Sequence, residues 1–234
     1  VQHLEKKILE LGDKNLKLEK QAQEIQEICL HVISSLTKAI EEKDPYTAGH
    51  SERVTMYALR IAGEMGLPEK EIQILKRASM LHDIGKLVID LAYLNKEGPL
   101  TPEEWASISR HPNIAASILS PIKFLEREVE IIRHHSERWD GKGYPDGLKG
   151  KEIDDLTGIL ILADSFDAMT SDRCYKRKKS FEEAIKEIKK CSGTHFDPKI
   201  ADIFISLVEK EKEIFEPGIR ESVDNADNYL RVKS

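Results

Sequence analysis

The sequence predicts an all-α protein, a helical bundle preceded by a long coiled-coil helix. Apolar residues follow a heptad repeat through the first 36 residues, helix start signals recur along the remaining chain, and alternating strand patterns are almost absent. We therefore expect three parts: a coiled-coil dimerisation helix over residues 1–34, a globular helical domain over residues 35–215, and a polar C-terminal tail over residues 216–234.

The heptad repeat predicts the first helix. Its d positions are Leu4, Leu11, Leu18, Ile25 and Val32, and its a positions are Ile8, Asn15, Ala22, Cys29 and Leu36. An asparagine at an a position lowers stability but specifies register, which favours a parallel two-stranded coiled coil. The sequence therefore predicts a parallel homodimer. The alternative is one amphipathic helix that folds back on its own domain, because repeats of 3.5 and 3.6 residues diverge slowly.

Helix start signals divide the domain that follows. Pro68 is expected at the first position of one helix, and Thr101 precedes another that has a proline and two glutamates in its first turn. Residues 180–183 form a capping box, and Asp197 precedes a further helix that begins with proline. Four glycines and a proline within residues 139–150 exclude a stable helix there and predict a loop.

Composition limits the partners and the compartment. The net charge of −6 and the isoelectric point of about 5.8 disfavour binding to a DNA or RNA polymer or to an anionic membrane. Three cysteines without CxxC spacing indicate a reducing compartment and no disulfide framework. No segment resembles a transmembrane span or a signal peptide. We expect a cytoplasmic protein and, because the chain starts in mid-pattern, the cytosolic part of a longer signalling protein with an upstream sensor domain.

Histidines and carboxylates suggest a metal site. His82 and Asp83 follow an apolar helix, where a buried polar pair needs a partner because burying it alone is costly. Asp164 ends the apolar run 158–164, and Asp167 follows it on the same helical face. Imidazole and carboxylate ligands suit Fe, Mn, Zn and Ni, and a carboxylate can bridge two ions. This set of residues is typical of a dinuclear metal site.

These residues lie in motifs that resemble a known family. Residues 82–86 (HDIGK) resemble the HD motif of the HD phosphohydrolase superfamily. Residues 134–145 (HHSERWDGKGYP) resemble the motif that names the HD-GYP subfamily. Further similarity lies in residues 44–54, 163–173 and 193–198, so the resemblance covers about residues 31 to 212.

The resemblance implies a phosphodiesterase that hydrolyses cyclic di-GMP to pGpG or GMP, with residues 35–215 as its catalytic domain. By position in the motifs, the metal ligands are His50, His82, Asp83, His111, His134, His135 and Asp164, and the catalytic residues are His82, Asp83 and Lys86. The implied substrate contacts are Lys86, Gly143, Tyr144, Asp167, Arg173 and Lys176. Two divalent ions are expected, Fe or Mn with Ni and Zn as alternatives, and no organic cofactor.

Physical chemistry supports these roles. Two ions about 4 Å apart lower the pKa of a bridging water and neutralise charge on the phosphate. Lys86 adds a point charge, and Arg173 offers two parallel donors to the second phosphate. Tyr144 is expected to stack on a guanine.

Two positions depart from the family pattern. Ser136 stands directly before Glu137, where many relatives have histidine. Either His134 and His135 act as the ligand pair, or Ser136 replaces one ligand and His134 lies outside the first shell. Tyr46 stands where some relatives have a glutamate for a third metal, which favours a dinuclear site. Glu137 and Arg138 are expected to form a surface pair of little energetic worth.

Two other functions remain open. The protein could be a receptor that binds a cyclic dinucleotide without turnover, or an HD hydrolase of another phosphoester such as a mixed cyclic dinucleotide. Because the heptads run directly into the helix before His50, we also expect the coiled coil to regulate access to the site.

Overall fold

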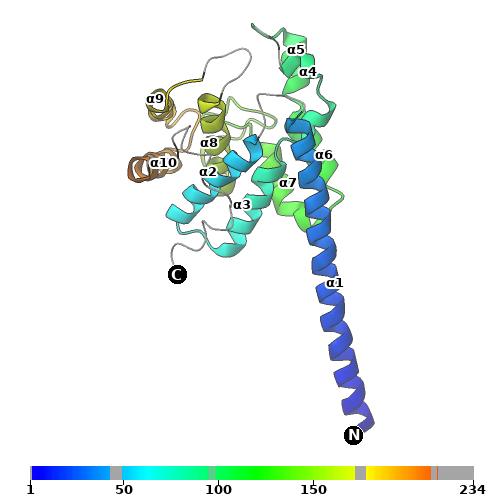
Figure 1. Ribbon diagram of the computed structural model, residues 1–234. Coiled ribbons are helices and arrows are strands. Elements are labelled where there is room, and N and C mark those ends of the chain that lie inside the picture. The colour runs from blue at the N-terminus through cyan, green and yellow to red at the C-terminus, as the bar shows by residue number, and fades with distance from the viewer. Residues whose placement is uncertain are drawn as a thin grey trace. The chain divides into compact units, whose positions relative to one another are not determined.

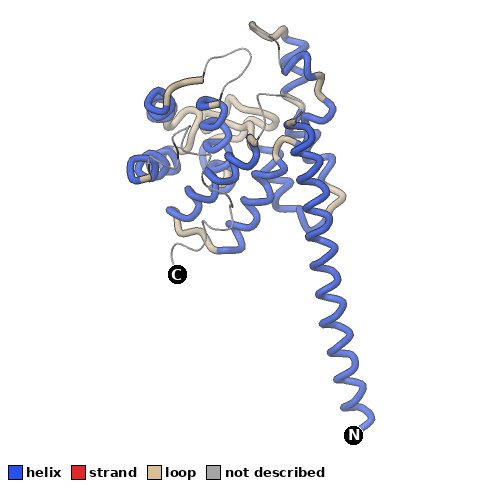
Figure 2. The backbone as a smooth tube through the Cα atoms, viewed as in Figure 1, coloured by secondary structure: helices blue, strands red, loops and turns tan. Residues whose placement is uncertain are grey.

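The computed structural model describes residues 2–42, 49–94, 96, 98–171, 178–211 and 215. Its elements are α1 (Gln2–Glu41), α2 (His50–Glu64), α3 (Glu69–Leu81), η1 (Ile84–Val88), α4 (Leu91–Leu94), α5 (Pro102–Ile108), α6 (His111–Leu119), η2 (Lys123–Leu125), α7 (Glu126–His134), η3 (Gly150–Glu152), α8 (Asp155–Thr170), α9 (Phe181–Cys191) and α10 (Pro198–Lys210). Figure 2 contains helices and loops but no strand in these ranges. The predicted all-α class is confirmed.

The contacts divide the chain into two compact units, residues 1–36 and 37–234. The first unit lies within α1, which is one continuous helix (Figure 1). Several of its predicted d residues are more than half exposed, namely Leu11, Leu18, Ile25 and Val32. Of the predicted tail, 216–234, nothing falls within the described residues. The division of the chain into three parts stays a prediction. Among the described helices, none combines the length and hydrophobicity of a membrane span.

Helix α8 is the centre of the second unit. It packs against α2, α3, α7, α9 and α10 (Figure 1), and eleven of its sixteen residues are buried. This explains why residues 158–163 are apolar around the whole helix: neighbouring helices cover every face of that stretch. Phe166 makes edge-to-face contacts with Tyr57 at 5.0 Å and with Phe204 at 5.0 Å between ring centroids, which join α8 to α2 and α10.

The helix start signals are mostly confirmed. Thr101 Oγ1 accepts a hydrogen bond from Glu104 N at 3.3 Å, and Thr101 N donates to the Glu104 carboxylate at 2.7 Å. Ser180 and Glu183 form the same capping box. Asp197 accepts from Lys199 N at 2.7 Å. Pro68 was predicted as the first residue of a helix but is its N-cap, so α3 begins one residue later, at Glu69. The Pro68 carbonyl accepts the first helical hydrogen bonds.

The glycine-rich stretch is an ordered loop whose conformation depends on a buried acid. The Glu137 carboxylate is fully buried and accepts hydrogen bonds from Asp146 N at 2.7 Å and Gly147 N at 3.0 Å. A Cβ on Gly143 would meet the backbone of Glu137 and Arg138, so the close approach requires glycine. The expected surface pair is therefore wrong: Glu137 holds the loop, and Arg138 pairs with Asp140 at 2.9 Å.

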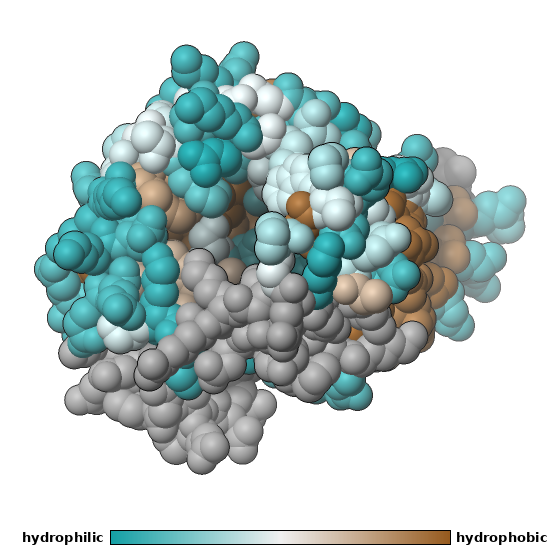
Figure 3. All heavy atoms as spheres, turned by 90° about the horizontal axis from the view of Figure 1, so that it is seen from above, coloured by the Kyte–Doolittle hydropathy of each residue, from teal (hydrophilic) through white to brown (hydrophobic). Residues whose placement is uncertain are grey.

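The outer surface of the second unit is polar. Figure 3 shows charged and polar residues over most of the visible described surface, with smaller apolar areas between them. One ion pair lies deeper, where Arg77 of α3 contacts the buried Glu128 of α7 at 2.6 Å. Among the described residues, most buried histidines and aspartates belong to one cluster, which lies where the ends of several helices meet α8.

Candidate metal centre

Helix ends bring the predicted ligands together. His50 and His111 are the first residues of α2 and α6, whereas His82 and His135 follow the last residues of α3 and α7. These four imidazoles are between 0% and 6% exposed. Residues at helix ends can converge on one point because each helix continues away from it. Asp164, from the middle of α8, joins them, so that six predicted ligands meet: His50, His82, Asp83, His111, His135 and Asp164.

Three of the histidines are oriented by the same backbone contact. The Nδ1 atoms of His82, His111 and His135 lie 2.7, 2.9 and 2.6 Å from the carbonyl oxygen three residues earlier. A carbonyl only accepts, so each Nδ1 carries the proton and donates it. Each Nε2 therefore keeps a lone pair, which is the tautomer that a metal ligand requires.

His111 and His135 face each other through these lone pairs. Their Nε2 atoms are 3.0 Å apart in the buried cluster. Two acceptors at this distance repel unless a cation lies beside both of them. The Nε2 atoms of His50 and His82 likewise have no hydrogen-bond partner in the part of the chain that the structure describes. Buried polar atoms without partners are costly, so the set fits metal ions.

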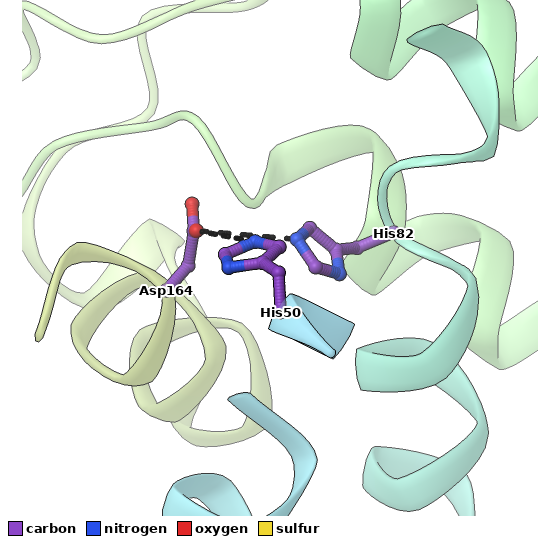
Figure 4. Close-up of side chains that lie close together, drawn as sticks. All are labelled: His50, His82 and Asp164. Carbon is purple, nitrogen blue, oxygen red and sulfur yellow. Dashed lines mark ion pairs between the residues drawn. The ribbon is translucent and has the colours of Figure 1, made fainter. Parts of the chain in front are cut away.

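Two carboxylates complete the cluster. Asp164 Oδ1 lies 3.2 Å from His50 Nε2 and 4.0 Å from His82 Nε2 (Figure 4). Asp83 directs one oxygen at His82, at 3.6 Å, and the other at His50, also at 3.6 Å. Two groups of three ligand atoms result, His50–His82–Asp164 and His82–Asp83–His135. The groups are adjacent because both contain His82, although its one Nε2 lone pair can bind only a single ion.

His50 is held from its other side. Its Nδ1 lies 2.8 Å from Asp167 Oδ2, and Asp167 is 1% exposed. Arg53, one helical turn after His50, donates to both oxygens of Asp167 at 2.7 and 3.0 Å. A carboxylate behind a ligand histidine fixes its orientation and increases its basicity.

The charges of the cluster change the pKa of its histidines. Burial lowers the pKa of His135 to about 3, and the imidazoles of His111 and His82 add to that shift. Burial also lowers the pKa of His111. For His50 the effect of burial is outweighed by the carboxylates of Asp164 and Asp167, which raise its pKa to about 10.

The pKa values of the two carboxylates in the cluster are lowered, which favours their ionised forms. Burial acts to raise the pKa of Asp164, but His50 and His82 hold it well below the ordinary value. Burial opposes ionisation of Asp83 too, yet Lys86, at 2.5 Å, and His82 lower its pKa. The lowered pKa values of His111, His135, Asp83 and Asp164 favour the ionisation states that bind a cation, whereas the anions around His50 favour positive charge at that point.

Comparison with known proteins now identifies the fold. The model of the HD domain family matches residues 34–200. The chain belongs to the HD-domain family. The GYP motif and the relatives make it a member of the HD-GYP subfamily. Over 227 residues it is 41% identical to a cyclic di-GMP phosphodiesterase of Thermotoga maritima, covering 93% of this chain and 60% of that protein.

Other HD-domain relatives have a different named substrate. The chain is 35% identical to the 3′3′-cGAMP-specific phosphodiesterase 2 of Vibrio cholerae, covering 78% of this chain and 35% of that protein. The crystal structure of a cyclic GMP-AMP specific phosphodiesterase of V. cholerae has the same fold, with a TM-score of 0.62 and 24% identity over 86% of this chain and 52% of that one. The chain thus spans between about a third and three fifths of the length of these curated relatives.

The predicted substrate contacts lie in different surroundings. Lys86 is beside the cluster, bound to Asp83. Tyr144 reaches the cluster from the glycine loop, with its ring 6.4 Å from that of His111, and Gly143 packs on the backbone of Glu137. Asp167 has both oxygens bound to His50 and Arg53, a position behind a ligand and not on an open surface.

Three predicted positions cannot be placed, and one lies elsewhere. Arg173, Lys176 and Tyr46 are outside the described residues. His134 contacts Asp146 on the surface, with Nε2 2.9 Å from Oδ2, whereas the adjacent His135 enters the cluster. In this structure His134 therefore points to Asp146 and not to the other histidines. The ligand roles themselves stay predictions.

Sequence reasoning missed several residues that support the HD domain's site. Arg53 and Glu137 lay within recognised motifs, but no role followed from their spacing. Glu41, the last residue of α1, is 5% exposed, and its carboxylate accepts from Ser51 N at 2.9 Å and also from Ser51 Oγ. Trp105 contacts Tyr144 edge-to-face at 5.8 Å. The sequence signal for Trp105 was weak: it is a large aromatic residue in a short helix whose other residues are mostly polar or small.

Proposed function

We propose that this HD-GYP protein is a metal-dependent phosphodiesterase that hydrolyses cyclic di-GMP to pGpG, GMP or both. One observation carries the proposal: four buried imidazoles gather with the carboxylates of two aspartates beside Lys86, and their Nε2 atoms face those carboxylates or one another. The similarity to the T. maritima enzyme supports the choice of substrate.

We propose two divalent ions, Fe or Mn, with Ni and Zn as alternatives. Bound there, they supply an activated hydroxide and neutralise charge on the phosphate. Asp83 directs one oxygen toward His82 and the other toward His50, so this carboxylate would be shared by both positions, whereas the single Nε2 lone pair of His82 would bind one ion. Lys86 Nζ lies 2.5 Å from Asp83, so its positive charge is beside the cluster, where it would stabilise negative charge on a bound phosphate.

The protein residues also control orientation and water access. The backbone carbonyls behind His82, His111 and His135 keep each imidazole in one tautomer. Tyr144 covers the cluster from the glycine loop, and the Glu137 carboxylate fixes that loop. Arg173 and Lys176 remain proposed contacts to the second phosphate.

Product analysis tests the proposal. Protein purified without oxygen and loaded with Mn or Fe is incubated with cyclic di-GMP, and the products are separated by chromatography. We expect pGpG or GMP, and no product from Asp83→Ala. Tight binding without turnover by the unaltered protein would make it a receptor. Neither binding nor turnover would refute the assignment of this ligand.

A mixed cyclic dinucleotide is the second candidate substrate. The V. cholerae relative named for 3′3′-cGAMP is 35% identical over most of this chain, which favours including that compound. The two substrates differ by one base, so the metal centre does not discriminate between them. Comparing kcat/KM for both under the same metal loading decides which one is preferred.

We further propose that this chain is cytoplasmic, forms a parallel dimer through α1 and is regulated by an upstream sensor domain. The exposed d residues of α1 support the dimer. The contact between Glu41 and Ser51 supports the regulation, because Ser51 is next to His50 in the first turn of α2. If deletion of residues 1–30 left dimerisation and basal activity unchanged, this part of the proposal would be wrong.

A further inference from the structure

Trp105 is an exposed tryptophan close to the candidate metal centre. It is 51% exposed on α5, a helix in which no residue is buried. A tryptophan at such a position stabilises the fold less than a buried one, because about half of its surface stays in water. Burial in the core of this domain therefore does not explain it.

The position of Trp105 is nevertheless fixed. The capping box of Thr101 and Glu104 defines the first turn of α5. Lys96 Nζ contacts the Glu104 carboxylate at 2.6 Å and ties this turn to the preceding segment. The Trp105 ring then lies 5.8 Å from the Tyr144 ring at an interplanar angle of 84°.

Tyr144 connects Trp105 to the metal centre. Its ring meets the His111 ring at 6.4 Å and 80°. Its backbone N–H donates to the carbonyl oxygen of Ser136, the residue after His135, at 3.2 Å. Edge-to-face contacts on two sides leave Tyr144 part-buried, as a wall of the site. The neighbouring Trp105 has the open aromatic surface.

We propose that Trp105 is the stacking surface for one purine base of the cyclic dinucleotide, in place of the stacking predicted for Tyr144. The inference rests on the proposed function, since it assumes a substrate that carries bases. A base projects sideways from the phosphate ring, so its subsite lies beside the metal ligands. Trp105 is placed there, one ring beyond Tyr144, and any base offers it a π face.

Three variants separate stacking from simple apolar contact. Trp105→Ala removes the ring, Trp105→Leu keeps an apolar side chain, and Trp105→Phe keeps a smaller π face. We expect KM for cyclic di-GMP to rise about tenfold in the alanine and leucine variants, as for the loss of one base–aromatic stack. The phenylalanine variant retains most of the affinity, and kcat changes by less than about twofold in all three, because no metal ligand is altered.

Fluorescence provides an independent readout. The chain has two tryptophans, so Trp139→Phe leaves Trp105 as the sole indole. We expect rapid quenching of its emission when the metal-loaded variant is mixed with cyclic di-GMP in a stopped-flow instrument. An unchanged KM in Trp105→Ala, an equal KM in the leucine and unaltered proteins, or the absence of quenching would overturn the inference. The inference would also be overturned if Trp105→Ala changed the oligomeric state and left KM unaltered. That result would mean that the ring contacts another protein chain.

These outcomes are distinct from failure of the proposed function. If the unaltered protein turns over cyclic di-GMP and Trp105→Ala has the same KM, only the stacking inference fails. Quenching without turnover would keep the inference and make the protein a receptor. Neither turnover nor quenching would reject both.

Discussion

His50 and His135 lie in one buried cluster, yet their pKa values move in opposite directions, to about 10 and about 3. His50 is surrounded by Asp164 and Asp167, which we call the carboxylate half of the site. His135 faces His111 and His82, and His111 and His135 form the imidazole half. His82 and Asp83 lie between the two.

The difference teaches how one fold prepares two unlike cation positions. The carboxylate half attracts positive charge strongly enough to protonate a buried histidine. The imidazole half expels protons, because burial and neighbouring rings penalise them, and it keeps its lone pairs available. A metal ion must displace a proton in one half but not in the other.

Removing a carboxylate ligand should have the largest effect. In Asp164→Ala the carboxylate half loses the group shared by His50 and His82, so metal content and activity should fall by more than about 100-fold, beyond the effect of outer-shell changes. Elemental analysis and cyclic di-GMP turnover measure both quantities. Asp155→Asn, at the part-exposed start of the same helix, is the matched control and should retain both. Normal metal content in Asp164→Ala would contradict the two-half description.

The carboxylate behind His50 should have the next largest effect. Asp167→Asn keeps an acceptor near His50 Nδ1 but removes the charge, and Asp167→Ala removes both. We expect metal affinity to fall by roughly 10–100-fold in the alanine variant and by less in the asparagine variant. Competition with a chelator measures the affinity. Equal affinities in all three proteins would mean that Asp167 does not support the metal site.

Proton release should separate the two halves. At pH 8 His50 is protonated in the metal-free protein, since its pKa is about 10, whereas His135 is neutral. Metal binding should therefore release about one proton per protein. Calorimetry in two buffers of different ionisation enthalpy measures the number. Release of none would show that His50 is already neutral.

Stability of the metal-free protein follows the same logic. Because the folded pKa of His50 lies above the unfolded value of about 6.5, its contribution is complete below pH 6.5 and is lost as the pH rises through 10. His135 has a lowered folded pKa, so it opposes folding as the pH falls from 6.5 toward 3. Urea denaturation across this range should show both slopes, and metal should abolish the loss at high pH.

The contact at the end of α1 should have the smallest effect. Glu41→Gln weakens the hydrogen bonds to Ser51 beside His50, and we expect a loss of about 1–2 kcal/mol in the free energy of unfolding. Activity should also fall, because Ser51 and His50 share the first turn of α2, and a shift of that turn would move His50 away from Asp164 and Asp167. Urea denaturation measures the loss. Glu42→Gln, at the exposed neighbour, is the control, and an equal loss there would contradict a specific role.

Much of the fold could be predicted from the sequence because its signals are local. Capping boxes at Thr101 and Ser180 define helix starts through contacts three residues apart. The burial of α8 follows from its continuous apolar run. Glu137 could not be predicted as buried, because its partners are backbone groups nine and ten residues away that approach only when the glycine loop folds.

The sequence indicated which residues belong to the site, but not how their side chains are arranged. The motif lists His134 and His135 as neighbours, and only the end of α7 determines which one enters the cluster. Asp164 and Asp167 share a helical face, but Arg53 from another helix occupies the oxygens of Asp167. Such assignments depend on side chains from distant segments, which spacing within one helix does not reveal.

The adjacent histidines allow the most direct test of the central claim that the buried cluster is a hydrolytic metal centre. His135→Ala and His134→Ala are compared for metal content and for cyclic di-GMP turnover under the same loading. The structure predicts that His135→Ala loses at least about 100-fold in turnover together with bound metal, whereas His134→Ala retains both. Loss of both in His134→Ala, with His135→Ala unaffected, would contradict the account.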